Sequence, residues 1–244
     1  MNYRAMFMTA AAMAACLTGT SAFAQAEGVP KPAVNPGGVG GASNRNSMTD
    51  FERRMNLNNM FENPASAAKG YDDSRLIAGC VVKLSGSKAG ALIGGEGTKD
   101  PHFTKLSNAM TGRYTSCLRG ASAKSLSPVL LNSAIAETLV EHDGATGVAD
   151  RAASVDTDKA SAFHGDLSGP VTINNIARCT VVYSPGLARK VLATEAGSAE
   201  EKFALDALYS QTPECGMATT PTSVGQILQR SAIADASYAW SQQK

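Results

Sequence analysis

The chain has 244 residues, a formal net charge of +1 and only 6% aromatic residues. This near-neutral composition argues against nucleic acid as a partner, because non-specific nucleic-acid binding rests on a positive excess. It also argues against electrostatic docking on anionic lipid, which needs clustered basic residues. If the chain has a macromolecular partner, we expect an unknown protein or envelope component.

The first 24 residues have the pattern of a secretory signal peptide. Arg4 precedes an apolar stretch, and the small residues Ala22 and Ala24 form a cleavage site. Cleavage after Ala24 removes Arg4, so the 22 basic residues become 21, against 21 acidic ones. The pattern predicts an exported protein, periplasmic or secreted; a lipoprotein anchored through Cys16 is the less favoured alternative, because Met13 is atypical in a lipid-attachment box. No later apolar run reaches the roughly 18 residues of a membrane helix, so no integral span is expected.

Residues 25–71 predict a flexible N-terminal segment. Its first part, 25–46, is rich in Pro and Gly. Such a composition cannot bury enough apolar surface to offset the entropy of ordering. A short helix is expected near 49–61, with Thr49 as its N-cap.

Two later segments resemble each other and predict two tandem helical repeats, 72–142 and 172–244, joined by a linker over 143–171. At an offset of 99, Ile77 and Cys80 match Ile176 and Cys179. At an offset of 98, the run Ser-Ala-Ile-Ala at 133–136 reappears at 231–234. Nearly all the retained residues are small or apolar, which indicates that the repeat preserves packing.

Four cysteines remain after cleavage, and an even set in an exported protein indicates disulfides. Because equivalent residues of repeated units should pair in equivalent ways, we expect the bridges Cys80–Cys117 and Cys179–Cys215. Each closes a loop of about 37 residues, for which chain entropy predicts a stabilisation of roughly 4 kcal/mol. A zinc site is the alternative, but the spacing lacks the paired C-x-x-C or His pattern of such sites, so no metal is expected.

Apolar residues spaced three and four apart predict about four short helices in each repeat, and hence a mainly all-α fold. A strand is the alternative for the first element of each repeat, because β-branched residues cluster there. The first and third helices should be clamped by the disulfide. The predicted helix starts are Asp72 or Asp73, Ser87, Pro101 and Ser127 in the first repeat, and Pro185, Ser198 and Ser223 in the second, where Ser198 with Glu201 and Ser223 with Gln226 form capping boxes.

The sequence contains no complete catalytic motif. The three histidines, His102, His142 and His164, belong to no metal-ligand pattern, and we expect them to be exposed. Nucleotide-binding glycine loops and a C-x-x-C redox pair are also missing. We therefore expect no catalytic residue and no cofactor.

Two acidic pairs are retained in both repeats: Glu96 with Glu195 in a loop, and Glu137 with Asp235 in the most similar helix. The favoured interpretation makes the loop pair solvated and the helix pair edge carboxylates with a basic partner. The alternative makes these residues a ligand-binding feature.

The last helix adds two aromatic candidates. Tyr238 and Trp240 lie close together there and are candidate anchors for a partner, although core packing is the commoner role of such residues.

The Cys-Val-Val run at 80–82, the second cysteine at 117 and the Ala-Ile-Ala-acid helix at 134–137 resemble small secreted repeat proteins of Gram-negative bacteria. The resemblance implies export and tandem units, and it implies no particular activity. We expect a non-enzymatic exported protein with a binding or structural role. The alternative is a small-ligand binding protein or a hydrolase-type enzyme with a pocket between the repeats.

Overall fold

The computed structural model describes residues 63–94, 101–118, 126–144, 147–169 and 171–243. These residues are helical and contain no strand, which confirms the predicted all-α fold. They all belong to one compact unit, which spans Ser47–Lys244. The signal peptide, the Pro- and Gly-rich segment and the helix predicted near 49–61 lie outside the described residues.

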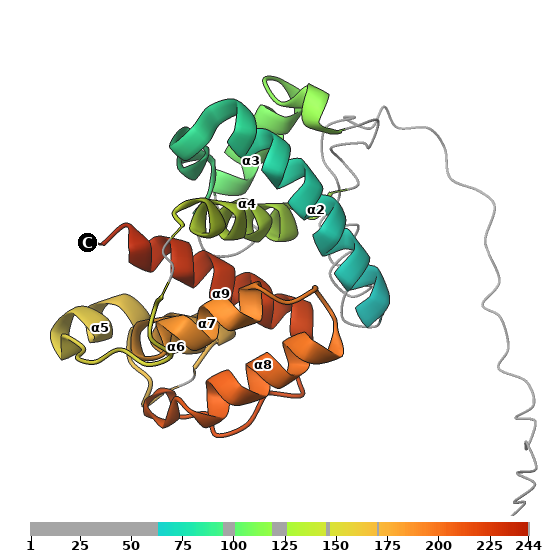
Figure 1. The fold of residues 1–244 in the computed structure, drawn as a ribbon. Coiled ribbons are helices and arrows are strands. Elements are labelled where there is room, and N and C mark those ends of the chain that lie inside the picture. Colours follow the sequence, from blue (N-terminus) through green and yellow to red (C-terminus); the bar gives the residue numbers. More distant parts are fainter. Residues whose placement is uncertain (1–62, 95–100, 119–125, 145–146, 170, 244) are drawn as a thin grey trace, which may run out of the picture. The chain divides into compact units, whose positions relative to one another are not determined.

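The fold consists of two halves whose elements follow the same order (Figure 1). A helix is followed by a short helix, a third helix, a 3-10 turn that carries a cysteine, and a last helix. In the first half these are α2 (Pro64–Ser85), the 3-10 helix η1 (Gly86–Leu92), α3 (Pro101–Thr111), η2 (Thr115–Leu118) and α4 (Pro128–His142). In the second half they are α6 (Ile173–Tyr183), α7 (Pro185–Leu192), α8 (Ala199–Ser210), η4 (Pro213–Cys215) and α9 (Gln226–Ser241), with α5 (Thr157–His164) between the halves.

Helix α2 begins at Pro64, not after Asp72 or Asp73 as predicted. Asn63 is its N-cap, because the side-chain oxygen accepts a hydrogen bond from the Ser66 N–H at 3.1 Å. Pro64 suits the first helical position, where no backbone donor is needed. Residues 64–71, predicted as part of the flexible segment, therefore form the first two turns of a 22-residue helix.

Two other predicted helix starts are wrong in detail. The element expected from Ser87 is the 3-10 helix η1, which starts at Gly86. Helix α9 starts after Gly225 rather than at Ser223, because the Gln226 side chain donates to the Ser198 carbonyl at 2.8 Å instead of capping its own helix. Ser198 caps α8 as expected, by accepting from the Glu201 N–H at 3.1 Å.

The segment predicted as a linker, 143–171, is packed against the second half where it is described. It contains α5, whose N-cap Asp156 accepts hydrogen bonds from the first turn. Phe163 of α5 lies 5.0 Å from Trp240, measured between ring centroids. The Gly186 N–H donates to the Ala149 carbonyl at 3.1 Å, which ties the segment to the start of α7.

Both predicted disulfides are present, Cys80–Cys117 and Cys179–Cys215. Each joins the first helix of its half to the 3-10 turn, η2 or η4. The prediction placed the second cysteine on the third helix, but α3 and α8 end before it, at Thr111 and Ser210.

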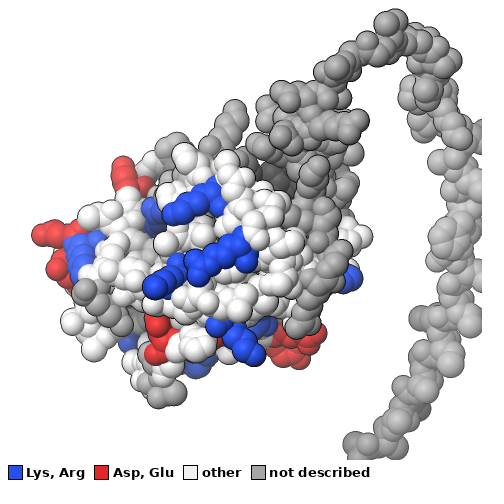
Figure 2. All heavy atoms as spheres, turned by 90° about the horizontal axis from the view of Figure 1, so that it is seen from above, with Lys and Arg blue, Asp and Glu red and all other residues white. Residues whose placement is uncertain are grey.

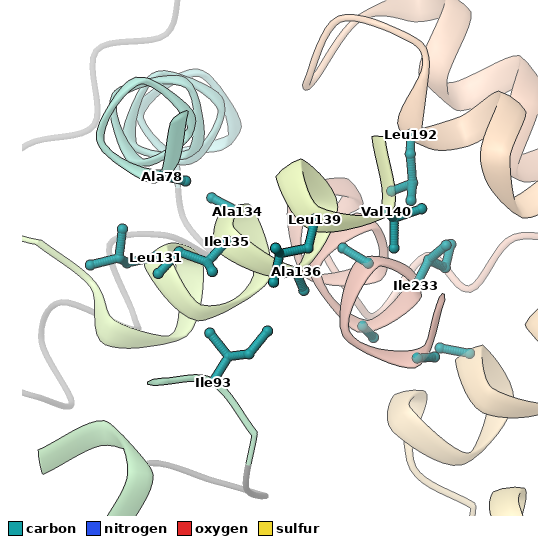
Figure 3. Packing of buried hydrophobic residues seen from close by; sticks show 14 of the residues in the cluster. Ala78, Ile93, Leu131, Ala134, Ile135, Ala136, Leu139, Val140, Leu192 and Ile233 are labelled. Atoms are coloured by element: carbon teal, nitrogen blue, oxygen red, sulfur yellow. The ribbon is translucent and has the colours of Figure 1, made fainter. Parts of the chain in front are cut away.

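The two halves share one hydrophobic core, centred where α4 packs against α9 (Figures 1 and 3). Ala134, Ala136 and Ala234 are fully buried there, and such small side chains let two helix backbones approach closely. Ile135 and Ile233 fill the space on either side. Two separate domains joined by a linker would divide this core, whereas the described residues form a continuous cluster.

We expect the double substitution Cys179→Ser and Cys215→Ser to lower the free energy of unfolding by roughly 2–4 kcal/mol, because the bridge restricts the unfolded chain. Urea denaturation of the oxidised protein measures this change, with the corresponding Cys80 and Cys117 variant alongside. An unchanged denaturation midpoint would contradict the stabilising role of the bridge.

Candidate functional site

The retained acidic pair Glu137 and Asp235 lies at the crossing of α4 and α9, the only region of the described residues where both halves contribute buried charge to one cluster. The two carboxyls have different surroundings there. Glu195 is exposed in the loop after α7, as predicted for a solvated residue. Glu96 lies outside the described residues, so its pairing with Glu195 stays a prediction.

Glu137 forms a fully buried ion pair with Arg230 of α9. Arg230 donates from Nη2 to Glu137 Oε1 at 2.7 Å and from Nε to Oε2 at 3.0 Å, the fork geometry in which Arg binds carboxylates best. Nη1 donates to Glu201 Oε1 at 2.8 Å. The carbonyls of Val191 and Leu192 accept at 3.1 Å and 2.7 Å. All five N–H donors of the guanidinium therefore have acceptors.

Helix α2 completes this buried cluster from the first half. The Tyr71 hydroxyl donates to Glu137 Oε2 at 2.6 Å, and Arg75 Nε lies 3.0 Å from Oε1. Burial raises the pKa of Tyr71 well above its usual value, and the charge of Glu137 raises it further. Burial alone would lower the pKa of Arg230, but its bonds to Glu137 and the charge of that carboxylate outweigh burial and raise it. Glu137 thus has the basic partner that was predicted, but the prediction of an edge position was wrong, because α2 and α9 cover this carboxylate completely.

A pocket with a volume of about 140 Å³ opens at the same crossing. Its walls come from both halves, and small or polar side chains predominate. Asn174 and Ala239 stand at its more exposed side. The lining residues are Ile93, Gly94, Asn132, Ala136, Asn174, Arg178, Ala232, Asp235, Ala236 and Ala239.

Asp235 supplies the carboxyl of this pocket. Its Oδ1 accepts a hydrogen bond from Asn132 Nδ2 at 2.9 Å, and its Oδ2 lies 3.0 Å from the Ser133 hydroxyl. Asn132 is held in turn by the Gly94 N–H, which donates to its Oδ1 at 3.1 Å. Burial raises the pKa of Asp235 to about 7, against the opposing effects of Ser133, Asn132 and the charge of Arg178. The carboxyl is therefore poised to change charge near neutral pH.

The ion pair and the pocket occupy matching positions in the two halves. Glu137 and Asp235 are 98 residues apart, and so are Asn132 and Arg230. The contact of α4 with α9 thus contains two matched sites, which we call the closed crossing and the open crossing. In the closed crossing the acid of α4 binds the guanidinium of α9, and in the open crossing the acid of α9 binds the amide of α4. The same two sequence positions therefore meet twice, once with an arginine and once with an asparagine.

Smaller side chains explain why only one of these crossings is open. At four matched positions the residue beside the pocket is shorter than its counterpart beside the ion pair. The exception is Arg178, which stands where the first half has Gly79. The four pairs are Arg230 with Asn132, Glu137 with Asp235, Arg75 with Asn174, and Glu141 with Ala239.

The two aromatic candidates lie near this pocket without lining it. Tyr238 is half-buried, and its hydroxyl covers Gly90 of η1 so closely that a Cβ at that position would require the Tyr238 ring to shift. Trp240 packs on Phe163 and directly follows Ala239, a pocket residue. Trp240 is the only tryptophan of the sequence and so reports on the pocket from its edge.

Neither a histidine nor a metal-binding group belongs to the pocket as described. His102 and His142 are exposed as predicted, whereas His164 is buried, with its Nδ1 2.7 Å from the Gly165 carbonyl. The prediction for His164 was wrong because α5 packs on α6 instead of lying in a free linker. Among the described residues, no group of three or more His, Cys, Asp and Glu side chains is arranged to hold a metal ion.

The sequence patterns did not predict Asn132, Arg178 or Arg230 as site residues. Arg230 carried a signal, because it directly precedes the retained Ser-Ala-Ile-Ala run in a helix with a buried face. Asn132 and Arg178 carried none by themselves. Comparison of the chain with protein-family models, curated proteins and solved structures finds no significant match.

Replacing Arg230 with Met should lower the free energy of unfolding by about 3–5 kcal/mol, because Glu137 and Glu201 would lose their shared buried cation. The matched control is Arg151→Ala, which removes the surface ion pair with Glu214 and should cost less than about 1 kcal/mol. Urea denaturation at pH 7 compares the two variants. Similar small losses in both would show that the buried cluster does not stabilise the crossing.

Asp235 should make stability depend on pH. Its pKa is raised from 3.8 to about 7 on folding, so between these values the folded protein binds more protons than the unfolded chain. The free energy of unfolding should therefore fall as pH rises from about 4 to 7, relative to the Asp235→Asn variant, which cannot titrate there. Urea denaturation across this range measures the difference, and a difference of opposite slope would refute the raised pKa.

Proposed function

We propose that this protein is an exported, non-enzymatic binding protein that holds a small polar molecule in the pocket between its two halves. The observation that carries the proposal is the pair of matched crossings. Arg230 fills one of them completely, while the other leaves the Asp235 carboxyl at an open volume.

Export is supported by the signal-peptide pattern of the first 24 residues and by the two disulfides. Disulfides persist in oxidising compartments such as the periplasm and the extracellular medium. Cleavage would occur near Ala24, which removes Cys16 and leaves the paired cysteines. In the described part of the chain, no helix has the length and apolar character to cross a membrane.

We also propose that the two halves are a tandem duplication. The order of their elements, their cysteine separations of 37 and 36 residues, and the shared Ser-Ala-Ile-Ala run support this origin. The resemblance to secreted Gram-negative repeat proteins points the same way. After duplication, the pocket would have arisen through the shorter side chains on one side of the crossing.

The pocket's chemistry supports binding rather than catalysis. It offers one carboxyl, one guanidinium, amide groups and alanine walls. The hydrolase alternative needs a nucleophile and a base within reach of each other. Ser133 is the hydroxyl beside Asp235, but it is fully buried, lies within 3.1 Å of the Val129 carbonyl and is not among the residues that line the pocket.

The pocket is large enough for a small organic group. An engineered cavity of about 150 Å³ in another protein holds benzene, which has six non-hydrogen atoms. The volume of about 140 Å³ therefore suits a ligand, or the head of a ligand, of similar size.

The surface charge supports the absence of nucleic acid among the partners. On the face shown in Figure 2, basic side chains lie on an otherwise uncharged surface, and acidic side chains lie toward its margin. This face carries both signs instead of a continuous basic patch, in keeping with the formal charge of +1. Nucleic-acid binding surfaces are usually basic throughout.

A panel of small amines, acids, amino acids and sugars should contain a compound that raises the melting temperature and changes Trp240 fluorescence. The Ala239→Leu variant should lose this response, because a larger side chain would occupy the pocket edge. Ala162→Leu, on the exposed side of α5, is the matched control and should keep it. A silent panel, or binding that survives Ala239→Leu, would contradict the proposed pocket.

A further inference from the structure

We infer that the pocket recognises a guanidinium or similar planar cationic group, which it binds through the carboxylate of Asp235. This inference rests on the proposed function and names the ligand's chemical class. It follows from what occupies the matched crossing in the other half of the same molecule.

The closed crossing shows which group fits between these helices. There the acid on one central helix holds a guanidinium through two hydrogen bonds, from Nη2 at 2.7 Å and from Nε at 3.0 Å. The carbonyl of Leu192, at the end of α7, accepts a third hydrogen bond. Ile93, 99 residues earlier, lines the pocket at the matching place. The internal ligand of the closed crossing is thus a planar cation between a carboxylate and the end of a short helix.

In the open crossing the carboxylate is retained, but no cation stands at the position matched to Arg230; the guanidinium near Asp235 is that of Arg178, from α6. Asn132 stands at the position of Arg230, and its short amide reaches only Oδ1 of Asp235. Asn132, 98 residues before Arg230, lines the pocket with this shorter side chain. Ala136, Ala232 and Ala236 form apolar walls, as a flat, weakly hydrated cation prefers.

One guanidinium acts on Asp235, whereas Glu137 pairs with two, those of Arg230 and Arg75. Arg178 of α6 lines the pocket and lowers the pKa of Asp235, but burial still raises that pKa to about 7. The Arg178 guanidinium is itself positioned by Phe163, with its Cζ 5.5 Å from the ring centroid and Nη1 3.5 Å from the carbonyl. The neighbours of Asp235 on α4, Asn132 and Ser133, are uncharged. A bound cation would stabilise the ionised carboxyl and release a proton as it binds.

The test uses the mature, oxidised chain and methylguanidinium at millimolar concentration, with sodium chloride at equal ionic strength as the reference. Calorimetry and Trp240 fluorescence should show saturable binding that tightens about tenfold between pH 6 and pH 8, as Asp235 ionises. Asp235→Asn should weaken binding at least tenfold, whereas Asp158→Asn, at an exposed acid of α5, should not. Equal binding by wild type and Asp235→Asn would overturn the inference.

A second variant keeps the test decisive if Asp235→Asn folds poorly. Asn132→Arg places the guanidinium of the closed crossing into the pocket, so it should abolish methylguanidinium binding and lower the pKa of Asp235 in a carboxyl NMR titration. Unchanged binding by this variant would also overturn the inference.

The neutral isostere N-methylurea tests whether the pocket prefers a cation, separately from whether it binds a small molecule. Methylguanidinium should bind at least tenfold more tightly than N-methylurea. If both bind equally, and Ala239→Leu blocks both, the pocket stands and the cation preference fails. If neither binds and no compound of the panel responds, the proposed function fails as well.

Discussion

The arrangement of the two halves depends on one buried guanidinium. Arg230 is fully buried between Glu137 and Glu201. Its partners connect α2, α4, α7 and α8 to α9. Removing charges from water costs several kcal/mol for each ion unless partners compensate it. If α4 slid or rotated on α9, these charges would be left without partners in a low-dielectric core. The cluster therefore favours one register for two helices whose contact surfaces, built of Ala and Ile, would by themselves tolerate several.

The same geometry accounts for the position of the proposed binding site beside the buried ion pair. Under the proposed duplication, a repeated unit that packs against its own copy produces each interhelical contact twice. One copy of the contact is enough to fix the register, so the other is free to change. Asn, Asp and Ala stand on the pocket side where the matched positions have Arg, Glu and Glu, and the Asp235 carboxyl, hydrogen-bonded by Asn132 and Ser133, lies next to open volume. The pocket thus lies at the position that matches the site of the Arg230 side chain in the closed crossing.

Local signals in the sequence predicted the parts of this structure that depend on neighbouring residues. The helical class, the Ser198 cap and the start of α7 at Pro185 follow from spacing and from capping chemistry. The disulfides followed from comparing two segments of the chain with each other. The early start of α2 at Pro64 was missed because the capping Asn63 stands in the stretch that was predicted to be flexible from its composition.

The contacts that make the site lie far apart in sequence, and no local pattern encodes them. Arg230 meets Glu137 across 93 residues, and Asn132 meets Asp235 across 103. The repeat marked both acids, yet it gave them the same expected environment, because the partners that distinguish them come from the opposite half. Only the packing of α4 on α9 shows that one acid is neutralised by an arginine and the other faces a pocket.

The most direct test of the central claim, that the pocket is the open counterpart of the Arg230 site, is a crystal structure of the mature protein grown with methylguanidinium. We expect electron density for a planar group within hydrogen-bonding distance of Asp235, related to the Arg230 guanidinium by the same operation that superimposes the two halves. Density for water alone in a pocket soaked to saturation, or a methylguanidinium bound away from Asp235, would contradict it.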